Sequence, residues 1–229
     1  MTRRRVHGVV VTVLAAMLVT TSCGTGTSKT VSDPLPVAPS PPTVATVATS
    51  AATTPDLEGL LLRPSGYQPV PGDGMSGPVR TAEDVHRLFS DTPGMPAEIL
   101  GHGFVAGYVQ NWTRSTDPTA TASTVSTVEM TAVVLQFRSI AQATTMVRSF
   151  RRQAATLGYT EFAVPANLTA GYGVQQRQGS GDVTTSYYAV AWAHGPLVYE
   201  VSLQHSGPPT GEPHDVIAMA DRQDSRAVR

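Results

Sequence analysis

The chain has 229 residues, a formal net charge of −1 and one cysteine. A single cysteine excludes any disulfide within the chain, and it leaves a metal site to be built from histidines and carboxylates. The near-neutral charge gives no electrostatic reason to bind nucleic acid.

Residues 1–22 have the pattern of an export signal. Arg3, Arg4 and Arg5 form a basic start, and an uncharged apolar run extends from Gly8 to Val19. The run suits a signal sequence and is short of the roughly 20 residues that span a membrane. Removing this segment leaves 13 Lys and Arg against 17 Asp and Glu, a net charge of −4. Thr2-Arg3-Arg4 also fits a twin-arginine export signal faintly, so the export route stays open.

The apolar run ends in Val19-Thr20-Thr21-Ser22-Cys23-Gly24. Small residues directly before a cysteine resemble the bacterial lipobox, although Thr20 stands where a leucine is usual. In that family the signal is cleaved before the cysteine, and its thiol takes a diacylglycerol with fatty chains such as palmitate. The resemblance implies a protein held by Cys23 at the extracytoplasmic face of the cell membrane. A plain secretory signal with an incidental cysteine is the alternative.

Residues 23–55 are rich in Ser, Thr, Pro and Ala, and repeated prolines exclude a helix. We expect a disordered tether. The signal, lipobox and tether together resemble the small cell-envelope lipoproteins of mycobacteria and other actinobacteria. In such proteins a Thr/Pro-rich tether resembles a site of O-mannosylation, and an unmodified spacer is equally compatible with these residues.

Residues 56–226 are expected to form a single α+β domain, followed by a frayed end over 227–229. Apolar periodicities and capping residues predict two or three helices packed on a largely antiparallel sheet. The expected elements are a helix after Thr81, strands over 104–112 and 127–137, a helix from Ile140 to Leu157, short strands over 159–164 and 172–177, a hairpin of 187–193 and 197–205, and a helix from Pro213 that frays near Ser225. Phe104, Ala106, Tyr108 and Trp112 are expected to share one side of their strand.

Motifs for catalysis are weak. Gly72-Asp73-Gly74-Met75-Ser76-Gly77 satisfies G-x-G-x-x-G, but prolines and an acidic residue make it a loop rather than a dinucleotide site. Ser180 lies between two glycines without the context of a nucleophile elbow. No pair of histidines has metal-ligand spacing, so we expect no metal and no cofactor.

Strand aromatics are the most suggestive group, because they can line an apolar pocket or simply fill a core. The candidates for ligand binding are Tyr108, Trp112, Tyr188, Trp192 and Tyr199. The leading hypothesis is a non-enzymatic, lipid-anchored protein that binds an apolar ligand or another envelope protein. A cell-envelope hydrolase is the first alternative, and it requires two groups among His102, His194, His205, Glu129 and Glu200 to converge. A structural or assembly role, with a flat apolar patch, is the second.

Overall fold

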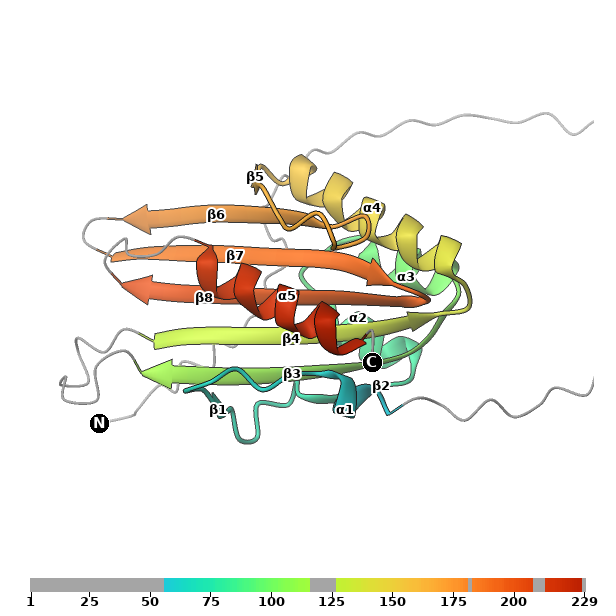
Figure 1. Ribbon diagram of the computed structural model, residues 1–229, viewed down its shortest axis with the longest axis horizontal. Helices are drawn as coiled ribbons and strands as arrows, with labels where there is room; N and C mark the ends of the chain where they lie inside the picture. Colours follow the sequence, from blue (N-terminus) through green and yellow to red (C-terminus); the bar gives the residue numbers. More distant parts are fainter. Residues whose placement is uncertain (1–55, 116–126, 181–182, 208–212, 228–229) are drawn as a thin grey trace, which may run out of the picture. The chain divides into compact units, whose positions relative to one another are not determined.

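The computed structural model describes residues 56–115, 127–180, 183–207 and 213–227. The expected signal segment, Cys23 and the tether lie outside these ranges. The described residues form three layers, with an antiparallel sheet between two layers of helices (Figure 1). The predicted α+β class with a largely antiparallel sheet is therefore confirmed. None of the helices in these ranges has the length and apolar character needed to cross a membrane.

The sheet has eight strands in the described part of the chain. Their order is β1-β3-β4-β8-β7-β6-β5, and β2 also pairs with β3. After β4 the chain crosses to the far edge through α4, and then returns strand by strand until β8 pairs with β4. The bounds are β1 Gln68–Pro69, β2 Gly77–Val79, β3 Phe104–Ser115, β4 Thr127–Phe137, β5 Thr160–Phe162, β6 Tyr172–Ser180, β7 Val183–His194 and β8 Leu197–Gly207.

Five helices accompany this sheet, where two or three were expected. They are α1 Leu57–Leu60, α2 Ala82–Leu88, α3 Met95–Gly101, α4 Ile140–Thr156 and α5 His214–Ala227. Thr81 caps α2 as predicted: its hydroxyl accepts a hydrogen bond from the Asp84 N–H, and the Asp84 carboxylate accepts one from the Thr81 N–H. The Ser139 side chain caps α4. The unpredicted α3 begins with Pro96 in its first turn, where a proline costs no hydrogen bond.

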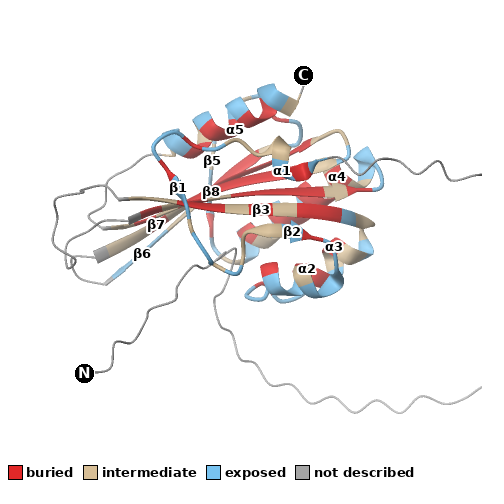
Figure 2. Cartoon of the chain, turned by 90° about the horizontal axis from the view of Figure 1, so that it is seen from below, coloured by how far each residue is buried: buried red, intermediate tan, exposed pale blue. Residues whose placement is uncertain are grey.

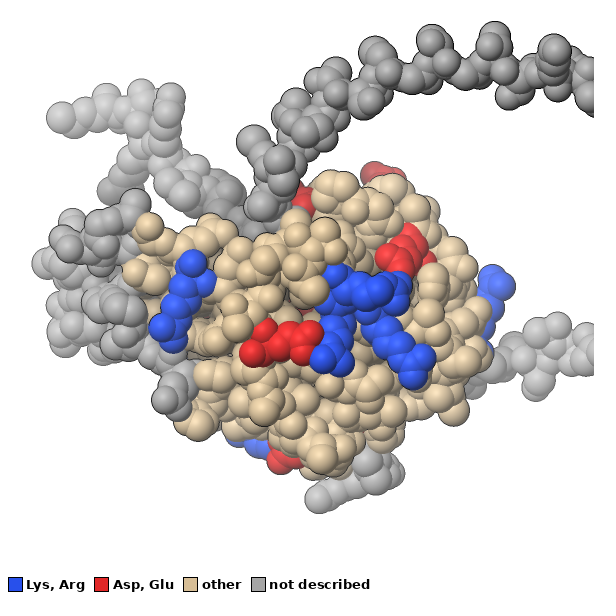
Figure 3. Space-filling view, turned by 90° about the horizontal axis from the view of Figure 1, so that it is seen from above, with Lys and Arg blue, Asp and Glu red and all other residues tan. Residues whose placement is uncertain are grey.

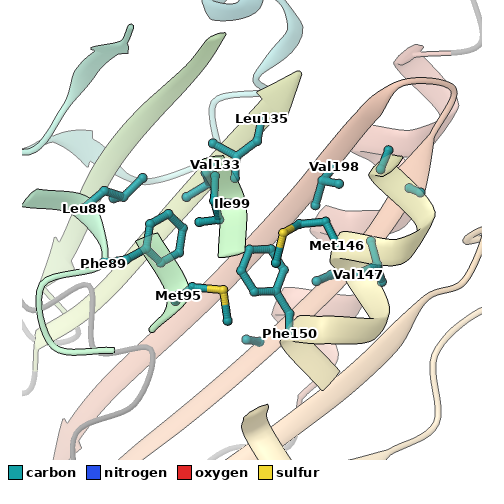
Figure 4. Packing of buried hydrophobic residues seen from close by; sticks show 14 of the residues in the cluster. Leu88, Phe89, Met95, Ile99, Val133, Leu135, Met146, Val147, Phe150 and Val198 are labelled. Atoms are coloured by element: carbon teal, nitrogen blue, oxygen red, sulfur yellow. The ribbon is translucent and has the colours of Figure 1, made fainter. Parts of the chain in front are cut away.

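Side chains alternate between the two faces of the sheet, and each face builds its own core. The α4-face core packs against α2, α3 and α4, and Figure 4 shows Phe89, Met95, Met146 and Phe150 meeting over the strands. The α5-face core packs against α1 and α5. In Figure 2 these helix layers lie on opposite sides of the sheet. β4 lies between β3 and β8, and it contributes Val133 and Leu135 to one core and Val134 to the other.

Phe104 lies on the opposite face from its predicted neighbours. The register of β3 against β4 shifts between Phe104 and Ala106, and such a bulge moves a side chain to the other face. Phe104 therefore packs against the α4-face core, with its ring 6.3 Å from that of Phe137. Ala106, Tyr108 and Trp112 remain together on the α5 face.

Gln223 of α5 joins the first described residues of the chain to its last helix. Its side chain is fully buried, and its Oε1 accepts a hydrogen bond from the Leu62 backbone N–H at 2.8 Å. Its Nε2 donates to the Leu60 carbonyl. One amide therefore satisfies two backbone groups of the segment that follows α1.

The outer face of α4 carries exposed arginines. Figure 3 shows arginines gathered beside acidic residues on this side of the molecule. Arg151 pairs with Glu161 at 2.6 Å, and Arg152 pairs with Glu98 at 3.4 Å. Because these pairs are exposed, each contributes at most about 1 kcal/mol to stability.

Candidate functional site

The face of the sheet that α4 covers changes from apolar to polar where the strands run past the helix. The inner rows include Val174 and Ala189, which belong to the α4-face core. No described helix covers the outer part of the strands (Figure 2). A half-buried outer row crosses β6, β7, β8, β4 and β3 in register and consists of Gln176, Tyr187, Gln204, Glu129 and Thr113.

A pocket of about 180 Å³ lies at the β6–β7–β8 end of this outer row. We call it the glutamine pocket, and it is lined by Tyr159, Gln176, Gln178, Thr185, Tyr187 and Gln204. Its volume is below the roughly 300–1,000 Å³ of sites for drug-sized molecules. The space therefore suits a small ligand or one ring of a larger one.

Tyr159 reaches the pocket because α4 ends sharply. Gly158 adopts φ 79°, a left-handed conformation that glycine favours at a helix end. The backbone N–H of Tyr159 then donates to the Ala154 carbonyl at 3.1 Å. This turn places the Tyr159 ring 5.7 Å from the Tyr187 ring, at an interplanar angle of 81°.

The lining of the glutamine pocket is uncharged, and it combines amides, a hydroxyl and two aromatic rings. The Gln178 amide donates to the Gln176 side-chain oxygen at 3.0 Å, so the two amides orient one another. Each glutamine offers donors and an acceptor on the same side chain. The pocket can therefore bind groups that donate and accept hydrogen bonds at once.

Glu200 lies beneath the pocket, in a small hollow that shares Tyr159 and Tyr187 with it. Burial raises the pKa of the Glu200 carboxyl to about 7, and the neighbouring Tyr187 hydroxyl lowers that pKa in part. Burial and the nearby Glu200 also raise the pKa of Tyr187 well above its ordinary value. The Tyr187 hydroxyl itself is buried, next to Glu200 and Ser202.

The aromatic residues predicted from the sequence lie on the opposite face, in and beside the α5-face core. Trp112, Tyr188, Trp192 and Tyr199 are each less than 5% exposed, and Tyr108 is half-buried at the margin. The Trp192 and Tyr199 rings stack at 5.2 Å, and Trp192 donates its ring N–H to Asp224 at 3.0 Å. The structure thus brings the five together beneath α1 and α5. Their role in ligand binding stays a prediction.

The five titratable residues of the hydrolase alternative do not converge within the described ranges. His194 contacts Asp224 at 3.2 Å, and His102 bonds to the Glu98 carbonyl. Glu129 lies two rows from Glu200 on the sheet, and burial raises the pKa of its carboxyl. His205 is on the α5 face. No described hydrogen bond joins two members of this group.

The glycine-rich segment 72–77 is a loop tied to the sheet, as its prolines suggested. Asp73 accepts hydrogen bonds from the backbone N–H groups of Met75 and Ser76 and from the Asn111 amide. These bonds lower the pKa of Asp73, against the effect of its burial. Its carboxylate occupies the place where a phosphate would need positive partners, so the loop is structural.

None of the five residues predicted to bind a ligand lines the glutamine pocket. A usable signal does exist in β6, where Tyr172, Val174, Gln176 and Gln178 alternate on one face and change from apolar to polar midway. That change marks the place where a strand leaves its covering helix. The contribution of Tyr159 has no comparable signal.

Residues 65–223 match a family model described as "Domain of unknown function (DUF7373) N-terminal". No curated protein matches the chain. Among solved structures, the extracellular domain of PknH from Mycobacterium tuberculosis is similar at 12% identity, with a TM-score of 0.44, over 75% of this chain and 94% of that one.

Two further solved structures show weaker likenesses. LpqN of Mycobacterium tuberculosis, described as involved in cell envelope biogenesis, gives 12% identity and a TM-score of 0.29 over 69% of this chain and 87% of that one. A protein of Bacteroides thetaiotaomicron gives 5% identity and a TM-score of 0.26, over 50% of this chain and 42% of its own length. These likenesses concern the fold alone.

Proposed function

The chain belongs to the DUF7373 family, and from this premise we propose that it is a lipid-anchored, extracytoplasmic protein that binds a small ligand without catalysing a reaction. The observation that carries the binding function is the glutamine pocket, whose uncharged lining brings three glutamine amides together with two tyrosine rings. A ligand bound there would pair with these amides, which offer both donors and acceptors.

The sequence favoured an apolar ligand or an envelope protein as the partner. The lining of the glutamine pocket instead favours a polar ligand, because an apolar molecule would cover amide groups without offering them a hydrogen bond. Each unsatisfied amide costs about 1–3 kcal/mol. Binding without catalysis is supported by the separation of Glu129 from Glu200, which are two rows apart on the sheet.

The binding proposal is tested by recovering the protein with its ligand. The full chain is purified from its native host in mild detergent, and the molecules that dissociate from it are identified by mass spectrometry. We expect a small molecule that is lost from the double variant Gln176→Ala, Gln204→Ala. The matched control is Gln68→Ala, an exposed glutamine on β1 at the other edge of the sheet. Recovery of the same molecule from both variants would contradict a site in this pocket.

The anchor is proposed from the residues around Cys23. A diacylglyceryl group supplies two fatty chains, and each buried methylene contributes about 0.8 kcal/mol to membrane binding. Cys23→Ala should abolish labelling by a radioactive fatty acid and leave the signal uncleaved at the lipoprotein site, as measured by autoradiography and N-terminal sequencing. Ser22→Ala keeps a small residue before the cysteine and should still be labelled. Undiminished labelling of Cys23→Ala would refute the lipid anchor.

A further inference from the structure

We infer that the ligand of the glutamine pocket is a neutral, polyhydroxylated molecule, such as one sugar ring of a glycan, an inference that rests on the proposed binding function. It follows from the chemistry of the lining and the size of the pocket, together with the charges around it.

Charge argues against ionic ligands. None of the six lining residues is charged. The closest ionisable groups in the register of the sheet are Glu129, beside Gln204, and Glu200, beneath Tyr187. Both are acids, so neither can offset the charge of an anionic ligand, and the described lining contains no cation. Arg177 does not provide that cation, because it faces away from the pocket and donates to the Tyr188 hydroxyl at 3.2 Å.

Hydrogen-bonding capacity favours hydroxyl groups. A sugar hydroxyl both donates and accepts, and the amides of Gln176, Gln178 and Gln204 present donors and acceptors together. The Thr185 hydroxyl in the lining adds a further donor and acceptor. A polyol can therefore satisfy several of these groups from one ring, whereas an apolar ligand satisfies none.

The two tyrosines supply the apolar part of the site. The rings of Tyr159 and Tyr187 meet almost at right angles, 5.7 Å apart. Aromatic rings suit the C–H groups of a pyranose, which are apolar although the rim of that ring is polar. The pocket volume of about 180 Å³ limits the bound part to a small group, so a longer glycan would extend beyond the pocket.

The test measures binding of defined sugars to the detergent-solubilised full chain by saturation-transfer NMR and calorimetry. The probes are methyl glycosides of glucose, galactose, mannose and arabinose, together with vesicles containing a neutral glycosyl diacylglycerol. We expect at least one glycoside to bind in the millimolar range or tighter. Gln204→Leu and Gln176→Leu should each weaken that binding at least about tenfold, as expected for the loss of one hydrogen bond.

Gln68→Leu serves as the matched control and should bind as the unmodified chain does, and unfolding temperatures show that each variant is folded. Binding of vesicles alone would identify a lipid-linked sugar, and binding of glycosides as well would identify recognition of the sugar itself. Recovery of a charged or purely apolar molecule from the native protein would overturn the sugar assignment and leave the binding function intact. If no molecule is recovered and no probe binds, both proposals fail.

Discussion

The buried carboxyl of Glu200 makes the stability of this protein depend on pH. Its pKa is about 7 in the folded chain and 4.5 in an exposed glutamate. Between these values the folded state holds a proton that the unfolded state has lost, so stability falls as the pH rises through this window. Above the folded pKa both states are ionised, and the cost of burying the charge levels off on the order of 3 kcal/mol.

Glu200→Gln removes that buried charge and tests its effect. The variant should be more stable than the unmodified chain by about 1 kcal/mol at about pH 5.5 and by on the order of 3 kcal/mol at about pH 8.5. Chemical denaturation at the two pH values measures the difference. Glu161→Gln is the control, because Arg151 lowers the pKa of this exposed acid and keeps it ionised throughout the window. An equal gain for Glu200→Gln at both pH values would contradict the assignment.

Within the elements, a close packing constraint lies where β3 passes between β2 and β4. A Cβ atom on Gly107 would be 2.7 Å from the Leu135 side chain, 3.0 Å from the Val134 carbonyl oxygen and 3.3 Å from the Val79 Cβ. The strands cannot separate without breaking their ladders. Glycine at this position therefore permits the close packing of three strands.

Gly107→Ala should accordingly lower the free energy of unfolding by about 2 kcal/mol, as expected for overpacking. Thermal unfolding of the two proteins measures the loss. Gly101→Ala makes the same chemical change in α3, where no neighbouring atom lies within 4 Å. It should be neutral or slightly stabilising, because alanine favours a helix. Equal melting temperatures for Gly107→Ala and the unmodified chain would show that β3 can move away.

For the whole molecule, the contact that closes the domain is the one between Gln223 and the segment after α1. Removing its amide leaves the Leu62 N–H and the Leu60 carbonyl without their hydrogen-bond partner. Gln223→Ala should cost about 2 kcal/mol of stability. Hydrogen exchange should also accelerate at residues 60–62 before it does so in the sheet. Ser225→Ala, an exposed change on the same helix, should stay within about 0.5 kcal/mol of the unmodified chain. Comparable losses in the two variants would argue against the closing role of Gln223.

Much of this fold could be predicted because its strongest elements have local signals. The period of α4, the alternation of β4 and the hairpin of β7 and β8 all follow from apolar spacing. Prediction from apolar spacing and residue preference fails where a residue departs from the usual pattern. Pro96 would break the interior of a helix but lies in the first turn of α3, and the bulge after Phe104 reverses a face that simple alternation would preserve.

The candidate site could not be predicted in the same way. Its parts come from β6, β7, β8 and the turn after α4, and only the crossover through α4 brings that turn beside β7. The strand aromatics do gather on one face of the sheet, but aromatic residues fill cores as readily as they line pockets. Trp192 and Tyr199 are almost fully buried under α5. The spacing of apolar residues along a strand does not show which half of that strand a helix will cover.

The strands β6 and β7 carry core and pocket residues in succession on one face. Val174 and Ala189 pack into the α4-face core, while Gln176 and Thr185 line the pocket farther along the same strands. Under the proposed binding function, exchanging the pocket residues would alter what is recognised without disturbing the packing that keeps the chain folded. Specificity could then change through a handful of codons at one end of the sheet, while the other end keeps the residues that the fold requires.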